Sequence, residues 1–178
     1  MGEFYIETGL STVNMSDYKR ILSLDSALAV VQFKKDDVAY ERDYFISYPA
    51  NVMAIRFKAD RPGKQNLIFS YAPNPVSTGS MVAQGDNGLV YSAALDNNGM
   101  KYVVRIQAET KGGTLVNRNG KLTVKGADEV VFYVTADTDI RLTLLQTLRI
   151  RKRMSGSILS KQRANGWLMR WPKVIRLC

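Results

Sequence analysis

Short runs in which apolar and polar residues alternate fill the first 139 positions of the chain. Alternation of period two places every second side chain on one face of a strand. Runs of this length, separated by turn residues about every eight to twelve positions, are typical of antiparallel sandwiches. The pattern therefore predicts an all-β fold, an antiparallel β-sandwich, with no helix before residue 140. The predicted strands span residues 3–8, 17–24, 27–34, 38–48, 52–59, 65–71, 89–96, 101–110, 114–117, 121–125 and 129–135.

Residues that favour tight turns separate these runs. Asn98-Gly99 and Asn119-Gly120 are expected to supply the positive φ that a type I′ hairpin turn requires at both central positions. Lys35-Asp36-Asp37 predicts a polar hairpin tip, and Arg61-Pro62-Gly63 predicts a turn similar to type II. Lys111-Gly112-Gly113 is a further permissive corner.

The apolar phase continues across one turn, at Asp25-Ser26. Leu22 and Leu24 precede this turn, and Leu28 and Val30 follow it with the same parity. We therefore expect both strands to offer one apolar face to a core.

The formal net charge of +9 is concentrated at one end of the chain. Residues 1–139 contain 15 Lys+Arg and 16 Asp+Glu, a net charge of −1. Residues 140–178 contain 10 Lys+Arg and no carboxylate, a net charge of +10. Two regions are expected from this difference: a β-sandwich domain over residues 1–139, and an irregular or helical basic tail over residues 140–178 that is not part of the fold.

The composition excludes several classes of site. The chain has no histidine, which excludes Ser-His-Asp and Cys-His catalysis and every His-ligated zinc or haem site. Its single cysteine, Cys178, excludes intrachain disulfides and CxxC metal sites. No apolar run is long enough to span a bilayer, and no signal-peptide pattern is present at the start.

Three groups of polar residues have compositions that occur in functional sites. Glu41 and Asp43 lie on the same face of a predicted strand, as a glycosidase carboxylate pair can, but a solvated strand face has the same spacing. Asp137 and Asp139 lack the six or more oxygen ligands that calcium requires. The glycine-rich residues 84–88 have no strand-then-helix context, so they predict a loop rather than a phosphate site.

Aromatic and basic residues on the predicted strands have structural interpretations too. Five tyrosines can form a sugar-stacking platform, but sandwich strands use tyrosine routinely for packing. Arg42 and Arg56 are expected to pair with acidic neighbours across the sheet. We therefore predict no catalytic, cofactor-binding or metal-binding residue and no cofactor. The five tyrosines are Tyr40, Tyr44, Tyr48, Tyr71 and Tyr91.

Three successive segments carry a resemblance to a known family. They are DYKRILSLDSALA at 17–29, VAYERDYFISYP at 38–49 and VMAIRF at 52–57, followed by the turn KADRPG at 58–63. Their spacing is continuous, and the strand pattern extends it to residue 139. These segments resemble the N-terminal β-supersandwich domain of glycoside hydrolase family 95, whose members are α-L-fucosidases and some α-L-galactosidases.

The resemblance implies that the chain is part of a non-catalytic domain. In that family the domain precedes and packs against an (α/α)₆ barrel, which holds the catalytic residues. Neither the barrel nor the first part of the family's domain has a counterpart here. No position matches a catalytic residue of the family, so none is carried over, and the chain alone is expected to be inactive. Family members typically act in the periplasm or outside the cell.

Three functions from different classes remain. The preferred one is a truncated fragment of a family 95 α-L-fucosidase without activity of its own. The first alternative is a stand-alone carbohydrate-binding sandwich that uses the tyrosines to bind a glycan. The second alternative, which is less favoured, is a binder of nucleic acid or anionic surfaces through residues 149–153, Trp167 and Trp171.

We predict that a shifted reading frame after Asp139 produced the basic tail. Residues 140–178 lack sustained strand or helix periodicity and begin where the family's chain continues with another strand. Synonymous codons can be chosen so that, with one lost base, a neighbouring frame reads without a stop. That frame reads as a strand, a turn and an amphipathic helix. The tail is therefore expected to be an unselected peptide.

Overall fold

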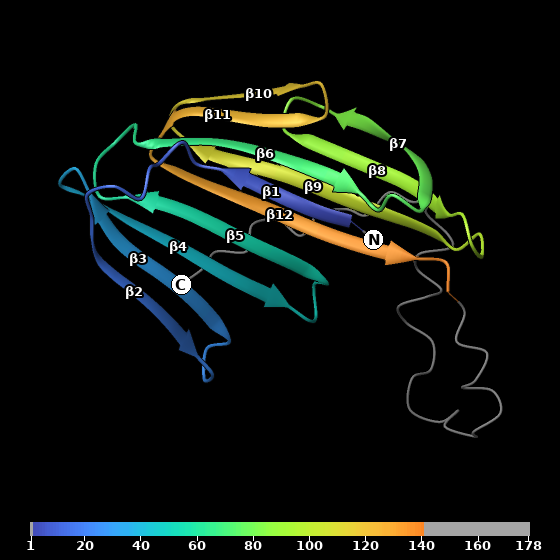
Figure 1. The fold of residues 1–178 in the computed structure, drawn as a ribbon, viewed down its shortest axis with the longest axis horizontal. Coiled ribbons are helices and arrows are strands. Elements are labelled where there is room, and N and C mark those ends of the chain that lie inside the picture. Colours follow the sequence, from blue (N-terminus) through green and yellow to red (C-terminus); the bar gives the residue numbers. More distant parts are fainter. Residues whose placement is uncertain (1, 141–178) are drawn as a thin grey trace. The chain divides into compact units, whose positions relative to one another are not determined.

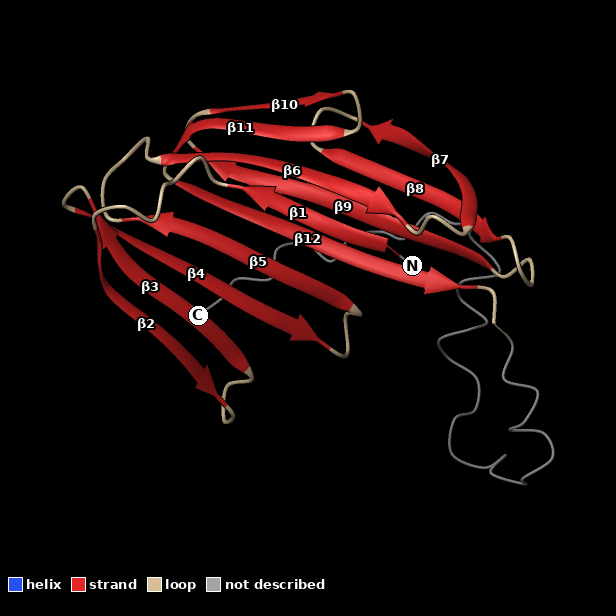
Figure 2. Cartoon of the chain, viewed as in Figure 1, coloured by secondary structure: helices blue, strands red, loops and turns tan. Residues whose placement is uncertain are grey.

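The computed structural model of the chain describes residues 2–140, which form two layers of β-strands (Figure 1). This part of the chain has twelve strands and no helix, and therefore no helix that can cross a membrane, so the predicted all-β class is confirmed (Figure 2). The strands are β1 (Gly2–Glu7), β2 (Met15–Ser23), β3 (Leu28–Lys35), β4 (Val38–Ser47), β5 (Val52–Ala59), β6 (Gln65–Pro73), β7 (Ser77–Gln84), β8 (Gly88–Leu95), β9 (Lys101–Lys111), β10 (Thr114–Arg118), β11 (Lys121–Ala127) and β12 (Glu129–Thr138).

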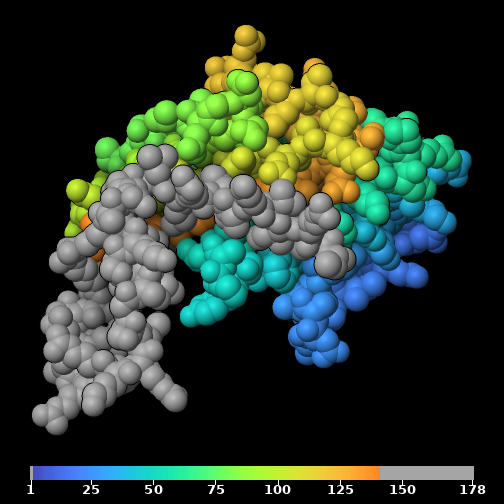
Figure 3. Space-filling view, turned by 180° about the vertical axis from the view of Figure 1, so that it is seen from behind, coloured from blue at the N-terminus to red at the C-terminus, as the bar shows by residue number. Residues whose placement is uncertain are grey.

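The strands form two sheets of unequal size. The larger sheet has eight strands in the order β2-β3-β4-β5-β12-β9-β8-β7, and the smaller has four in the order β1-β6-β11-β10. Neighbouring strands are antiparallel in both sheets. The smaller sheet lies over β5, β12, β9 and β8, and the predicted antiparallel sandwich is therefore confirmed. Seen from behind in Figure 3, the blue N-terminal strands and the green β7 and β8 lie towards opposite ends of the described part.

All eleven predicted strands are present, with ends that differ from the prediction by at most three residues. The twelfth strand, β7, was not predicted. It is an edge strand with the sequence STGSMVAQ, and most of its side chains are exposed. An exposed edge strand needs no apolar alternation, because neither of its faces is fully buried.

Two of the predicted hairpin turns have different geometries. Asn119 and Gly120 both have positive φ, 52° and 70°, as a type I′ turn requires. At Asn98-Gly99 the type I′ prediction is wrong, because only Gly99 has a positive φ, 70°. The Gly99 amide donates to the carbonyl oxygen of Leu95 at 2.8 Å, so the connection is a longer loop. The polar tip at Asp36 and Asp37 is confirmed, with φ of 50° and 58°.

Two other predicted turns connect the sheets rather than neighbouring strands. Pro62-Gly63 lies between β5 in the larger sheet and β6 in the smaller one. Gly112-Gly113 lies between β9 in the larger sheet and β10 in the smaller one. Local turn chemistry predicts that the chain reverses here, but not which sheet it enters.

The core lies between the two sheets. Phe69 of the smaller sheet and Phe132 of the larger one are fully buried, with ring centroids 5.0 Å apart. Phe57 packs edge-on against Phe132 at 6.1 Å. The remaining fully buried side chains come from both layers, as expected where alternate residues of facing strands interdigitate. They are Ile55, Leu89, Ile106, Leu122, Val124 and Val130.

The expectation that Leu22 and Leu24 face a core is wrong. Their exposed fractions are 68% and 84%, because no strand of the smaller sheet covers the larger sheet beyond β5. Phe33, Val38 and Tyr40, on β3 and β4, form a small second buried cluster. Strands β2 to β4 therefore form an overhang on whose inner face Leu22 and Ile46 are exposed, whereas Phe33 and Tyr40 are buried.

Candidate functional site

The predicted carboxylate pair lies on the outer face of the larger sheet, where it contacts an arginine. In the strand register Asp43 of β4 is paired with Arg56 of β5, and Gln32 of β3 is paired with Glu41. The Arg56 Nε donates to Asp43 Oδ2 at 2.6 Å, and a second guanidinium nitrogen contacts the same oxygen. The expected pairing of Arg56 with an acidic neighbour across the sheet is confirmed.

Glu41 also contacts the guanidinium of Arg56. Its Oε1 lies 3.6 Å from Arg56 Nη2, and its Oε2 accepts a 2.9 Å hydrogen bond from Gln32 Nε2. The side chain of Asp43 is 4% exposed and that of Glu41 is 32% exposed. Both carboxylates are therefore engaged by side chains of the neighbouring strands. The arrangement therefore suits cross-strand stabilisation rather than acid–base catalysis.

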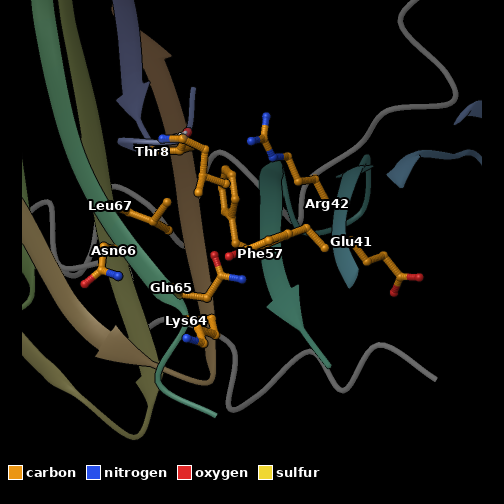
Figure 4. A pocket seen from close by; sticks show the side chains of 10 residues that line it. Thr8, Glu41, Arg42, Phe57, Lys64, Gln65, Asn66 and Leu67 are labelled. Carbon is orange, nitrogen blue, oxygen red and sulfur yellow. Dashed lines mark hydrogen bonds between the residues drawn. The ribbon is translucent and has the colours of Figure 1, made fainter. Parts of the chain in front are cut away.

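Arg42 points to the other side of the sheet, beside a small cavity (Figure 4). Arg42 was expected to pair with an acidic neighbour. Its guanidinium instead stacks on two aromatic rings, 5.0 Å from the Phe33 ring centroid and 5.6 Å from that of Phe57. Its Nε is buried without a hydrogen-bond partner. Gln65 and Thr8 also line the cavity, whose volume is about 10 Å³. This is space for about one water molecule and not for a sugar.

The tyrosines do not form one stacking platform. Tyr71 and Tyr91 pack in the sandwich interior with centroids 5.2 Å apart, and Tyr102, which the sequence did not single out, lies 6.0 Å from Tyr91. Burial, together with Tyr102 and Tyr91, raises the pKa of the Tyr71 hydroxyl well above its ordinary value. These rings are packing residues.

The other three tyrosines lie elsewhere in the larger sheet. Tyr40 stacks on Phe33 at 5.2 Å in the small second cluster. Tyr44 packs partly buried against the main core, and Tyr48, in the turn after β4, is 90% exposed. A sugar-binding platform needs several exposed rings on one surface, and these positions do not offer it.

The remaining candidate residues take part in hydrogen bonds with main-chain groups. Asp137 Oδ1 accepts a hydrogen bond from the Thr138 amide at 2.8 Å, and Asp139 Oδ1 accepts one from the Lys101 amide at 2.8 Å. Of the glycine-rich residues 84–88, residues 85–87 form the predicted loop, and Gln84 and Gly88 belong to β7 and β8. Asn117 Nδ2 donates to the carbonyl oxygens of Gly85 and Gly88. Within residues 2–140 no group of three potential metal ligands is present.

The chain is similar to a known domain family and to a curated protein. The family described as "Glycosyl hydrolase family 65, N-terminal domain" matches residues 1–143. The curated relative "Probable alpha-fucosidase A" of Aspergillus niger (strain ATCC MYA-4892 / CBS 513.88 / FGSC A1513) is 27% identical over 136 residues, which cover 71% of this chain and 16% of that protein.

A solved structure has a similar fold. Its description assigns it as a kojibiose phosphorylase from human microbiome, and it superposes with a TM-score of 0.54 at 12% identity over 91% of this chain and 24% of that chain. An identity this low shows the fold alone. The chain therefore spans about a sixth of the curated relative and about a quarter of the structural one.

Proposed function

The chain belongs to the family of glycosyl hydrolase family 65 N-terminal domains, and on this premise we propose that it is the non-catalytic β-sandwich domain of an α-L-fucosidase of glycoside hydrolase family 95. The observation that carries the fucosidase assignment is the 27% identity over 136 residues to an α-fucosidase of which the chain spans only 16%. The segments at 17–29, 38–49 and 52–57 support family 95 in particular.

The geometry of the described residues supports a non-catalytic role. Glycoside hydrolysis needs a proton donor and a second carboxylate on opposite sides of a sugar-sized space. Here Asp43 is bound by Arg56, Glu41 is bound by Gln32 and Arg56, and the cavity beside Arg42 is about 10 Å³. In the whole enzyme the partner of this domain is the (α/α)₆ catalytic barrel, which packs on it.

The two alternative functions have less support. A carbohydrate-binding module would present its tyrosines together, whereas Tyr71 and Tyr91 pack inside the sandwich and Tyr40 packs in the separate small cluster. A nucleic-acid binder would use the basic residues 140–178, and those beyond Ile140 lie outside the described part of the chain. The enzyme-fragment function depends neither on the tyrosines nor on the basic residues 140–178.

The test is hydrolysis of an aryl α-L-fucoside by the purified chain, with a full-length α-L-fucosidase as positive control. We expect no turnover above the uncatalysed rate, because the groups that give an enzyme its rate enhancement are absent from the described site. Turnover that disappears in Glu41→Gln or Asp43→Asn would overturn the proposal and assign the carboxylate pair a catalytic role.

A further inference from the structure

The hairpin of β10 and β11, in the smaller sheet, carries three basic side chains on its outer face (Figure 1). Leu122 and Val124 of β11 are buried in the core. Because side chains alternate along a strand, Lys121 and Lys125 lie on the opposite, exposed face. Arg118 is exposed at the end of β10, directly opposite Lys121. Arg118, Lys121 and Lys125 together form what we call the basic hairpin face.

The strand register of this hairpin places two like charges directly opposite each other. Arg118 is paired with Lys121, and like charges at such positions weaken a strand pair. Elsewhere in the described sheets, charged residues that lie directly opposite each other have opposite signs, as Asp43 and Arg56 do. Within residues 2–140 the basic pair is therefore an exception, and its repulsion needs a negative charge from another source.

The described part of the chain does not supply that negative charge. Within residues 2–140 no ion pair joins the basic hairpin face to a carboxylate. Residues 111–125 contain four Lys+Arg and no Asp or Glu, although residues 1–139 as a whole have a net charge of −1. Positive charge that is concentrated on one exposed face attracts anionic ligands.

The side chains of the basic hairpin face suit an extended anionic chain. The planar guanidinium of Arg118 can bind a carboxylate or sulfate group with two hydrogen bonds. Lys121 and Lys125 are four residues apart, about 13 Å along the strand, which is too far for both to hold one small ion. Thr123 lies between the two lysines and Thr114 lies opposite Lys125, so hydroxyl groups are available to hydrogen-bond sugar hydroxyls.

We propose that the basic hairpin face binds an anionic glycan, a chain of sugars that carries carboxylate or sulfate groups. The choice of a glycan rests on the proposed function, because a domain of a glycoside hydrolase acts beside a polysaccharide. Residues 114–125 contain no aromatic residue, which disfavours single-stranded nucleic acid, whose bases stack on aromatic rings. The face holds the glycan and takes no part in bond cleavage.

The exposure of the three cations sets the expected strength of binding. Ion pairs between exposed groups are weak, so we expect a dissociation constant on the order of 1 mM at low ionic strength. Added salt screens such pairs, and binding should weaken steadily as the salt concentration rises.

The first experiment is an NMR titration of the full chain with an oligogalacturonate, a heparin-derived oligosaccharide and a neutral malto-oligosaccharide of equal length. Residues 140–178 carry ten further Lys+Arg, so binding is read from the backbone amide shifts of residues 114–125 rather than from total uptake. We expect saturable shifts with at least one of the two anionic glycans, and none with the neutral one.

Inorganic sulfate and a single-stranded DNA oligonucleotide complete the titration. Absence of shifts with both anionic glycans, or equal shifts with the neutral glycan, would overturn the proposal. Equal affinity for sulfate alone would reduce the face to an adventitious ion site, and tighter binding of the DNA would assign it to nucleic acid. Each of these results leaves the non-catalytic assignment standing, because the fucoside assay tests that assignment separately.

The second experiment compares two triple variants of equal charge. Replacing the basic hairpin face by glutamines should raise the dissociation constant about tenfold or more, because three ion pairs are lost. The matched control removes three exposed cations elsewhere and should change it less than about threefold. Equal losses would mean general charge attraction and would contradict a site. The hairpin substitutions are Arg118→Gln, Lys121→Gln and Lys125→Gln, and the control substitutions are Lys19→Gln, Arg61→Gln and Lys101→Gln.

A single charge reversal separates binding from folding. Lys121→Glu places a carboxylate opposite Arg118, which replaces a repulsive pair by an attractive one. We expect this variant to lose the glycan-induced shifts while its unfolding midpoint is unchanged or higher. Retained glycan binding in Lys121→Glu would overturn the proposal.

Discussion

At the scale of single residues, the Asp43–Arg56 ion pair is the contact with the largest predicted effect on stability. The Asp43 side chain is 4% exposed, whereas that of Arg56 is 24% exposed and that of Glu41 is 32% exposed. Removing the partner of a buried charge costs far more than removing that of an exposed one, because the remaining ion has lost its water without compensation. The three residues of this cluster should therefore differ in how much they matter.

We expect Arg56→Leu to lower the free energy of unfolding by about 3–5 kcal/mol, since it leaves the Asp43 carboxylate buried and unpaired. Glu41→Gln is the control and should cost about 1 kcal/mol or less, because that carboxylate is partly solvated. Urea unfolding followed by far-UV circular dichroism measures the stability loss of each variant. Equal losses in the two variants would contradict the assignment of the pair as the buried contact.

Tyr71 is a second residue with a specific expectation. Its hydroxyl is buried beside that of Tyr102 but makes no hydrogen bond of ordinary geometry, so Tyr71→Phe should leave stability unchanged or raise it by about 1 kcal/mol at neutral pH. Tyr102→Phe is the control, because the Tyr102 hydroxyl lies 2.8 Å from Ser77 Oγ and losing that hydrogen bond should cost about 1 kcal/mol. A loss of stability in Tyr71→Phe would indicate a partner for its hydroxyl.

The same residue should affect the alkaline limit of stability. Burial raises the folded-state pKa of Tyr71 above the ordinary value of 10.0, so its contribution is fully present below pH 10 and is lost as pH rises towards the folded pKa. Tyr40 and Tyr133 also have pKa values raised mainly by burial, so the decline should persist in Tyr71→Phe with a smaller slope. Unfolding free energies measured from pH 8 upwards test this; an identical slope in the variant would contradict it.

At the scale of elements, the crossover between β9 and β10 depends on one glycine. Gly113 has a φ of 68°, and a Cβ on it would lie 2.4 Å from the Lys125 carbonyl oxygen and 2.5 Å from the Ala127 amide nitrogen. Gly99 has a similar φ of 70°, but a Cβ there would have nothing within 4 Å. Alanine at Gly99 therefore tests backbone strain alone, and alanine at Gly113 tests backbone strain together with a steric clash.

Gly99→Ala should lower the free energy of unfolding by about 1–2 kcal/mol, the cost of left-handed backbone for an L-residue. Gly113→Ala should cost at least about 2 kcal/mol more, because β10 must also move away from β11 to admit the methyl group. Thermal or denaturant unfolding of the two variants compares them directly. Similar losses of stability in the two variants would mean that β10 can shift to admit the methyl group at little cost.

At the scale of the whole molecule, the described sandwich accounts for residues 2–140, and the origin of the basic tail stays a prediction. If one base was lost after the codon for Asp139, the neighbouring frame of the coding DNA should read without stops through and beyond Cys178 into barrel-like sequence. Sequencing that DNA tests it. Scattered stops in that frame would contradict a frameshift and favour a selected basic tail.

The sequence by itself determined the local features of this protein. The alternation of apolar and polar residues located eleven strands, because the side-chain period of a strand depends only on its own backbone. The turn residues likewise marked the reversals at Asn119-Gly120 and Asp36-Asp37. The absence of histidine excluded several catalytic classes without any structure.

Only the tertiary structure decided which strands share a sheet and which faces are covered. Pro62-Gly63 and Gly112-Gly113 look like hairpin turns in sequence, yet both carry the chain to the other layer. Leu22 has the pattern of a core residue and is exposed, whereas Asp43 has the pattern of a surface residue and is buried against Arg56. Burial is a property of what lies opposite a strand, and that partner is distant in sequence, so no local pattern can specify it.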